Sequence, residues 1–196
     1  MTPLPYGDPG AKIAFYVLIG IFVVAEQRIR LRSLVRGEGS ATERTLLVVI
    51  ACLAGGVAVA FVLAGGETWA AIGFARWPLF IIGLVLMAAG IALRGWAIVV
   101  LGRFFTVDVR VTADQTVVDT GPYRWVRHPS YTGLLAVCAG IGLGLGNWLS
   151  LLAALVLPAV GVIVRIRHEE RALIDGLGEP YRRFAASRAR LIPGLW

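Results

Sequence analysis

Residues 119–133 hold most of the side chains in this chain that could take part in catalysis. They read Asp-Thr-Gly-Pro-Tyr-Arg-Trp-Val-Arg-His-Pro-Ser-Tyr-Thr-Gly and lie between two long apolar segments. Pro129 biases His128 toward extended backbone and suits the first turn of a following helix. A histidine held in this way can bind a ligand or move a proton, although a lone histidine often only bonds a carbonyl. The segment therefore predicts a polar loop at a membrane face, with both roles open for His128.

Arg165 and Glu169 lie where the last apolar segment meets a charged tail. Four residues apart, they share one helical face about one turn apart. Ionisable groups at membrane depth are costly and need a partner or a ligand. An ordinary ion pair between them remains an alternative to a catalytic role. Glu170 points about 100° away from Glu169 around the helix and could face either the site or solvent.

Other site classes find little support in the residues. His168-Glu169-Glu170 lacks the second histidine of H-E-x-x-H, so a zinc hydrolase is not expected. Cys52 and Cys138 lie inside apolar runs without CxxC or Cys/His spacing, which predicts neither a disulfide framework nor a metal site. There is no Ser/His/Asp order and no Walker loop. We therefore expect no metal.

The composition indicates one integral membrane domain over residues 1–196. Hydrophobic residues make up 58% of the chain, and the mean hydropathy is +0.77. The net charge of +7 comes almost entirely from arginine clusters that flank apolar runs. Such clusters fit membrane topology and anionic lipid headgroups better than nucleic acid. Membrane lipids are thus expected partners, nucleic acid is not, and no obligate protein partner is inferred.

Five apolar segments predict an all-α integral membrane protein with five transmembrane helices. The first should itself act as the insertion signal, because no basic region or cleavage site precedes it. A helical hairpin is expected for the fourth and fifth segments, which are short. The predicted spans are residues 11–30, 45–63, 78–101, 131–146 and 149–166, followed by an amphipathic tail over 167–196.

Glycines mark two further features of this predicted architecture. The tail should continue as a helix out of the fifth span and break near Gly176 and Gly178. It should then restart as a short helix with Pro180 in its first turn, and lie along the membrane surface. In the fourth span, alternating glycines give G-x-x-x-G spacings that favour close helix packing over a phosphate loop. These glycines are Gly140, Gly142, Gly144 and Gly146.

The arginines also predict the orientation in the membrane. With the N-terminus outside, the outer segments hold only Lys12 and Arg76. The central loop and the tail then lie on the cytoplasmic side. The excess of arginine over lysine is typical of bacterial coding, so a bacterial inner membrane is expected. The inner segments hold Arg28, Arg30, Arg32, Arg36, Arg44, Arg94, Arg103, Arg110, Arg124, Arg127 and the arginines from Arg165 onward.

Three motifs together resemble the isoprenylcysteine carboxyl methyltransferase family, to which phospholipid (phosphatidylethanolamine) methyltransferases are related. The motifs are residues 121–133, Glu169-Glu170-x-x-Leu173 and Gly178-Glu179-x-Tyr181. The resemblance covers roughly Leu101 to the C-terminus. It implies a multi-span helical enzyme that uses S-adenosylmethionine without a Rossmann fold, with its cytoplasmic pocket formed by the central loop and the helical tail.

The resemblance also implies the site residues. Arg165 matches the family's substrate-binding arginine, Glu169 closes the cofactor pocket, and Asp108 falls near a polar cofactor contact. The remaining cofactor contacts implied by the motifs are Gln115, Thr116, Val117, Val118, Tyr123, His128, Pro129, Ser130 and Tyr131.

The implied chemistry is an in-line methyl transfer from a sulfonium to a lipophilic small molecule or lipid. The protein mainly holds donor and acceptor in line. A carboxylate acceptor needs a cation such as Arg165 to position it. An amine acceptor would need a base, for which Glu169 and Glu170 are candidates. We expect carboxyl O-methylation of an isoprenylcysteine-like or other lipophilic carboxylate. The alternatives are phospholipid N-methylation, an NADPH-dependent reductase of the sterol-reductase type, and a non-catalytic carrier or scaffold.

Overall fold

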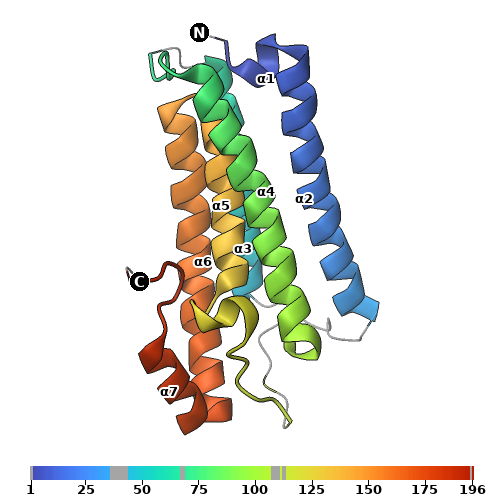
Figure 1. Ribbon diagram of the computed structural model, residues 1–196, viewed down its shortest axis with the longest axis vertical. Coiled ribbons are helices and arrows are strands. Elements are labelled where there is room, and N and C mark those ends of the chain that lie inside the picture. Colours follow the sequence, from blue (N-terminus) through green and yellow to red (C-terminus); the bar gives the residue numbers. More distant parts are fainter. Residues whose placement is uncertain (1, 36–43, 67–68, 107–110, 112–113, 195) are drawn as a thin grey trace.

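The structure is a computed structural model that describes residues 2–35, 44–66, 69–106, 111, 114–194 and 196. In this part of the chain, long helices run side by side as one bundle (Figure 1). The short helix α1 (Leu4–Gly7) lies at one end of the bundle, and α7 (Glu179–Ser187) lies at the other. The long helices are α2 (Pro9–Val35), α3 (Arg44–Gly66), α4 (Arg76–Leu101), α5 (Pro129–Gly144) and α6 (Trp148–Leu177).

Four of these helices are long and apolar enough to cross a membrane: α2, α3, α4 and α6. The 16 residues of α5 span about 24 Å at the helical rise. That is shorter than a hydrocarbon core of about 30 Å. Most of the α5 residues are buried, and α5 packs against α4 and α6. An all-helical membrane fold with four candidate spans is confirmed, while the fifth crossing stays a prediction.

Helix α6 runs past the predicted membrane span at its C-terminal end. The span was predicted to end at residue 166, and the helix continues out of it without a break to Leu177, as predicted for the start of the tail. Gly176 therefore lies inside the helix, and the break occurs at Gly178, whose φ of 64° favours glycine. Pro180 then lies in the first turn of α7, as predicted. At the other end, the Asn147 side chain accepts a hydrogen bond from the Ser150 amide and caps α6.

Glycines bring the backbones of α4 and α5 into contact. A Cβ added to Gly133 would lie 2.6 Å from the Gly90 carbonyl oxygen, and one added to Gly140 would lie 2.5 Å from that of Gly83. The two pairs are seven residues apart on both helices, so they share one face. The close packing predicted from the glycines of this segment is confirmed. Its partner glycines on α4 were not foreseen.

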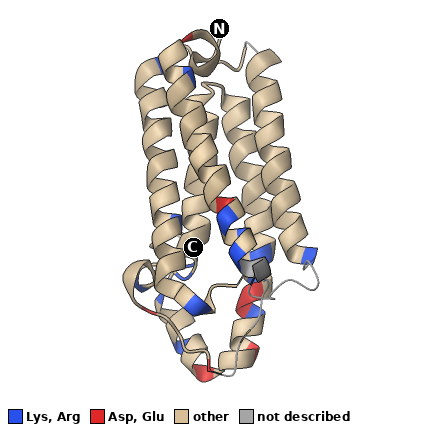
Figure 2. Cartoon of the chain, turned by 90° about the vertical axis from the view of Figure 1, so that its right-hand side faces the viewer, with Lys and Arg blue, Asp and Glu red and all other residues tan. Residues whose placement is uncertain are grey.

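Charged side chains gather mainly at the end of the bundle that carries the lower half of α6 and α7. In Figure 2 the rest of the length of the long helices carries few charged residues. Two of the arginines used for the orientation, Arg36 and Arg110, lie outside the described residues. An N-terminus outside and a C-terminus inside remain a prediction.

Candidate active site

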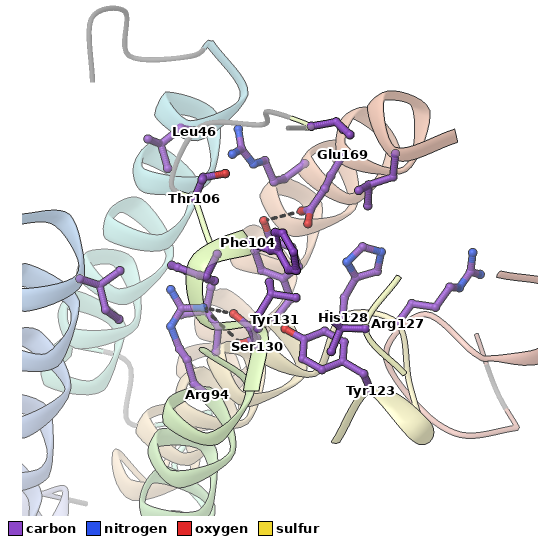
Figure 3. A pocket seen from close by; sticks show the side chains of 18 of the residues that line it. Leu46, Arg94, Phe104, Thr106, Tyr123, Arg127, His128, Ser130, Tyr131 and Glu169 are labelled. Carbon is purple, nitrogen blue, oxygen red and sulfur yellow. Dashed lines mark hydrogen bonds between the residues drawn. The ribbon is translucent and has the colours of Figure 1, made fainter. Parts of the chain in front are cut away.

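A cavity of about 200 Å³ lies at the charged end of the bundle. One wall is mainly apolar and comes from α2, α3 and α5, through Ile29, Leu46, Val49, Leu53 and Leu134 among others, with Glu26 and Arg30 of α2 as its charged members. The opposite wall is polar and comes from the loop before α5, the first turns of α5 and the inner face of α6 (Figure 3). A polar ligand and a lipophilic one could therefore meet in the same cavity.

Most of the predicted site residues line this cavity. Pro129 is an exception, because it is buried at the start of α5 and is not part of the lining. Asp108 lies outside the described residues. The structure thus brings together three separate parts of the chain, while the binding roles of these residues stay predictions. The lining includes Gln115, Thr116, Val117, Val118, Tyr123, His128, Ser130, Tyr131, Arg165 and Glu169.

The loop before α5 is held in a fixed shape. Gly121 has a φ of 55° and begins the 3-10 turn η2 (Gly121–Arg124). The Tyr123 side chain is buried, and its hydroxyl donates to the Ala97 carbonyl at 3.4 Å. Burial, followed by the charge of Glu169, raises the pKa of Tyr123, so the hydroxyl stays protonated at neutral pH. His128 precedes the helix outside the α region, at φ −125° and ψ 58°, so Pro129 excludes the helical conformation there without giving the extended backbone that was predicted.

Tyr131 and Glu169 join α5 to α6 at the cavity. The Tyr131 hydroxyl donates to Glu169 Oε2 at 3.0 Å, and both side chains line the cavity. The buried Arg165, one turn before Glu169, donates from a terminal guanidinium nitrogen to Thr45 Oγ1 of α3 at 2.7 Å. Both predicted catalytic side chains are thus oriented by partners on other helices.

An ion pair between Arg94 of α4 and Glu26 of α2 also lines the cavity, and the sequence did not single it out as a site. Arg94 Nε lies 2.5 Å from Glu26 Oε1, and a terminal nitrogen donates to Oε2 at 2.9 Å. The other terminal nitrogen donates to Ser130 Oγ at 2.6 Å. The available signal was an arginine inside an apolar segment, which needs a partner.

Glu170 lies behind the cavity wall rather than in it. Its side chain is buried and contacts three basic groups: Arg127 at 2.7 Å, Arg190 at 3.0 Å and His128 at 3.3 Å. Glu170 therefore faces neither the cavity nor solvent, but the loop that carries His128.

Two buried polar atoms beside the cavity have no hydrogen-bond partner within the described residues. They are Arg127 Nε and the Tyr181 hydroxyl, and both residues line the cavity. Burial, together with the charges of Glu170 and Glu169, raises the pKa of Tyr181, so it remains a neutral donor. Buried polar atoms usually have a hydrogen-bond partner, so these two are candidates to bond a polar ligand or water.

Comparisons with known proteins show that this chain is similar to a known family. The sequence profile of the isoprenylcysteine carboxyl methyltransferase (ICMT) family matches residues 81–175. The protein-S-isoprenylcysteine O-methyltransferase of Schizosaccharomyces pombe is 34% identical in an alignment of 148 positions that covers 67% of this chain and 62% of that protein. This chain is similar to the isoprenylcysteine carboxyl methyltransferase family. The match includes most of α4 and so begins before Leu101, where the sequence motifs place the resemblance.

Two further comparisons extend the likeness to the ICMT family. Protein-S-isoprenylcysteine O-methyltransferase A of Arabidopsis thaliana is 33% identical over 120 residues, which are 60% of this chain and 61% of the plant protein. This chain thus spans about three fifths of the length of these curated relatives. A solved structure of a eukaryotic intramembrane Ras methyltransferase of the ICMT type has a TM-score of 0.69 at 22% identity, covering 98% of this chain and 70% of that one. The two proteins share their fold.

Proposed function

We propose that this protein is an S-adenosylmethionine-dependent membrane methyltransferase that esterifies the carboxylate of an isoprenylcysteine-like or other lipophilic acceptor. The observation that carries the proposal is the cavity in which the polar wall around Tyr131 and Glu169 meets the apolar wall of α2 and α3. The match of residues 81–175 to the ICMT family supports methyl transfer. The named relatives are O-methyltransferases, which favours ester formation over phospholipid N-methylation.

The cavity residues fit a cofactor that is polar and positively charged at sulfur. S-adenosylmethionine supplies, when bound, an electrophilic methyl group on a sulfonium. Glu169 offers a carboxylate held by Tyr131, and Arg127 and Tyr181 each have a buried polar atom without a hydrogen-bond partner among the described residues. Pro129 acts through the backbone direction that it gives His128. The residues that would hold the cofactor are Gln115, Thr116, Val117, Val118, Tyr123, His128, Ser130, Tyr131 and Glu169.

Arg165 would orient the acceptor. An acceptor carboxylate is already ionised at neutral pH, so its oxygen can attack without a general base. What it needs is a cation that holds it while it is partly desolvated, and a guanidinium suits a carboxylate because it can donate two parallel hydrogen bonds. Thr45 holds the Arg165 guanidinium beside the apolar wall, where an acceptor's hydrocarbon chain would lie.

The same arrangement suggests two entry routes. The acceptor would reach the cavity from the bilayer beside α2 and α3, and the cofactor would enter from the aqueous side. The arginine distribution favours the cytoplasm as that side, with α5 as a fifth crossing and the N-terminus outside.

The experiment that tests the function is methyl transfer by the purified full chain in detergent. The protein is given S-adenosylmethionine labelled in the methyl group and N-acetyl-S-farnesylcysteine, and the lipid product is treated with base. We expect label that is released as methanol, because methyl esters are base-labile. An acceptor without the carboxylate should stay unlabelled. Base-stable label in a phospholipid extract would indicate N-methylation instead, and binding of NADPH without S-adenosylmethionine would indicate a reductase.

A further inference from the structure

Glu170 has no part in the methyl transfer described above, yet its side chain contacts three basic residues. It is buried, and its two carboxylate oxygens contact Arg127, His128 and Arg190. A single carboxylate thus holds two residues of the loop before α5 and one residue near the C-terminus. Because a buried carboxylate must be paired, these contacts are expected to persist in the folded protein.

The backbone near the C-terminus runs alongside the same loop. The Arg127 amide donates to the Ala189 carbonyl at 2.9 Å, and the His128 amide donates to the Arg190 carbonyl at 3.0 Å. Thr132 Oγ1 donates to the Leu191 carbonyl at 2.8 Å. The segment 188–192 therefore fixes the backbone of the residues that lead into α5.

The segment 188–192 is itself anchored. The Leu191 side chain belongs to the hydrophobic core, and its amide donates to the Trp196 carbonyl at 2.9 Å. The Arg190 guanidinium lies 5.0 Å above the Trp196 ring. None of the residues from 188 to 192 lines the cavity, whereas Arg127 and His128 both do. The segment thus contacts two residues that line the cavity.

We propose that Glu170 and Arg190 are positioning residues that hold the segment 188–192 against the loop and so set the orientation of Arg127 and His128 at the cavity. The proposal deepens the function given above and rests on it for the identity of the ligand. Its structural part, the docking of the segment on the loop, is independent of the ligand.

Arg190 is the better site for a test, because its side chain is 32% exposed and its replacement leaves Glu170 with two basic partners. Replacing Glu170 would leave Arg127, whose side chain is 11% exposed, buried without its carboxylate. We therefore choose Arg190→Ala, with Arg190→Lys as the conservative variant. Arg183→Met is the matched control, since Arg183 forms a surface ion pair with Glu179 and is 79% exposed.

Two measurements on the full chain in detergent test the proposal: amide hydrogen exchange over residues 126–132, and equilibrium binding of S-adenosylmethionine. In Arg190→Ala we expect faster exchange at the Arg127 and His128 amides and binding weakened roughly two- to fivefold, the scale of a partly exposed charge pair. Arg190→Lys should recover most of both, and Arg183→Met should match the wild type.

Unchanged exchange and unchanged affinity in Arg190→Ala would overturn the proposal. Faster exchange with unchanged affinity would also contradict it, because the segment would then dock on the loop without affecting the cavity. If the wild type itself bound no S-adenosylmethionine, the proposed function would fail. The exchange measurement would still decide whether the segment positions the loop.

Discussion

Tyr131 and Glu169, 38 residues apart in the sequence, are joined by a hydrogen bond of 3.0 Å from the phenol to Oε2. This contact brings the loop that carries His128 and the inner face of α6 to a common cavity. The two parts of the chain that carry the family motifs therefore meet in space, as a shared ligand site requires.

Tyr131→Phe tests the role of this contact. The change removes only the hydroxyl, so Glu169 loses the donor that orients it while the ring still packs. Losing one hydrogen bond to a charged group should weaken S-adenosylmethionine binding by roughly tenfold. Calorimetric titration of the detergent-purified protein measures the affinity. Equal affinities in wild type and variant would show that the hydroxyl does not matter for the cofactor.

Arg165→Ala tests the assignment of the acceptor-binding cation. Methyl transfer to N-acetyl-S-farnesylcysteine should fall by about 100-fold, the loss expected when a partner of a desolvated charge is removed. Cofactor affinity should stay within about twofold of wild type. Arg167→Ala, at an exposed position of the same helix, is the control and should keep its activity. Full turnover in Arg165→Ala would remove Arg165 from the mechanism.

The pair formed by Arg94 and Glu26 should behave as a coupled unit. Glu26→Ala leaves the Arg94 side chain, 12% exposed, without its carboxylate, which should cost about 3 kcal/mol of stability. The double variant Glu26→Ala/Arg94→Met should be less destabilised than the sum of the single changes. Thermal unfolding in detergent gives the loss of stability of Glu26→Ala, of Arg94→Met and of the double variant. Additive losses would mean that the two charges do not stabilise each other.

The contact between α4 and α5 should tolerate no added methyl group. Gly133→Ala would place a Cβ 2.6 Å from the Gly90 carbonyl oxygen, so the helices must move apart at a cost of about 1–3 kcal/mol. Gly20→Ala in α2 is the matched control, because nothing lies within 4 Å of the added atom. Its effect should be neutral or stabilising by about 0.5–1 kcal/mol. Equal melting temperatures for the two variants would refute the close approach of α4 and α5.

Hydropathy predicts the helices but not all of their ends. The apolar runs place α3 and α4 to within a few residues, since both are bounded by charges or glycines. Hydropathy alone does not place the end of α6, because it falls near Arg165, where the apolar segment ends, while the helix goes on to Leu177. The glycines of the tail predict that end instead. A helix ends where the backbone leaves the helical conformation, and the positive φ of Gly178 provides that change.

The candidate site was predictable where its residues are close in the sequence. Residues 115–131 form a local motif with marked proline and glycine signals, and Arg165 and Glu169 are one turn apart. Arg94 and Glu26 are 68 residues apart in the sequence. Glu170 and Arg190 meet only because the chain after α6 folds back past α7. Such pairs depend on tertiary packing, which a single sequence does not reveal.

Equilibrium binding of labelled S-adenosylmethionine to the purified wild type and to Glu169→Gln tests the central claim most directly. We expect saturable binding of one molecule per chain to the wild type. Binding to Glu169→Gln should be at least about tenfold weaker, because the amide removes the carboxylate that Tyr131 orients. A wild type without saturable binding, or a Glu169→Gln variant that binds with wild-type affinity, would contradict the account.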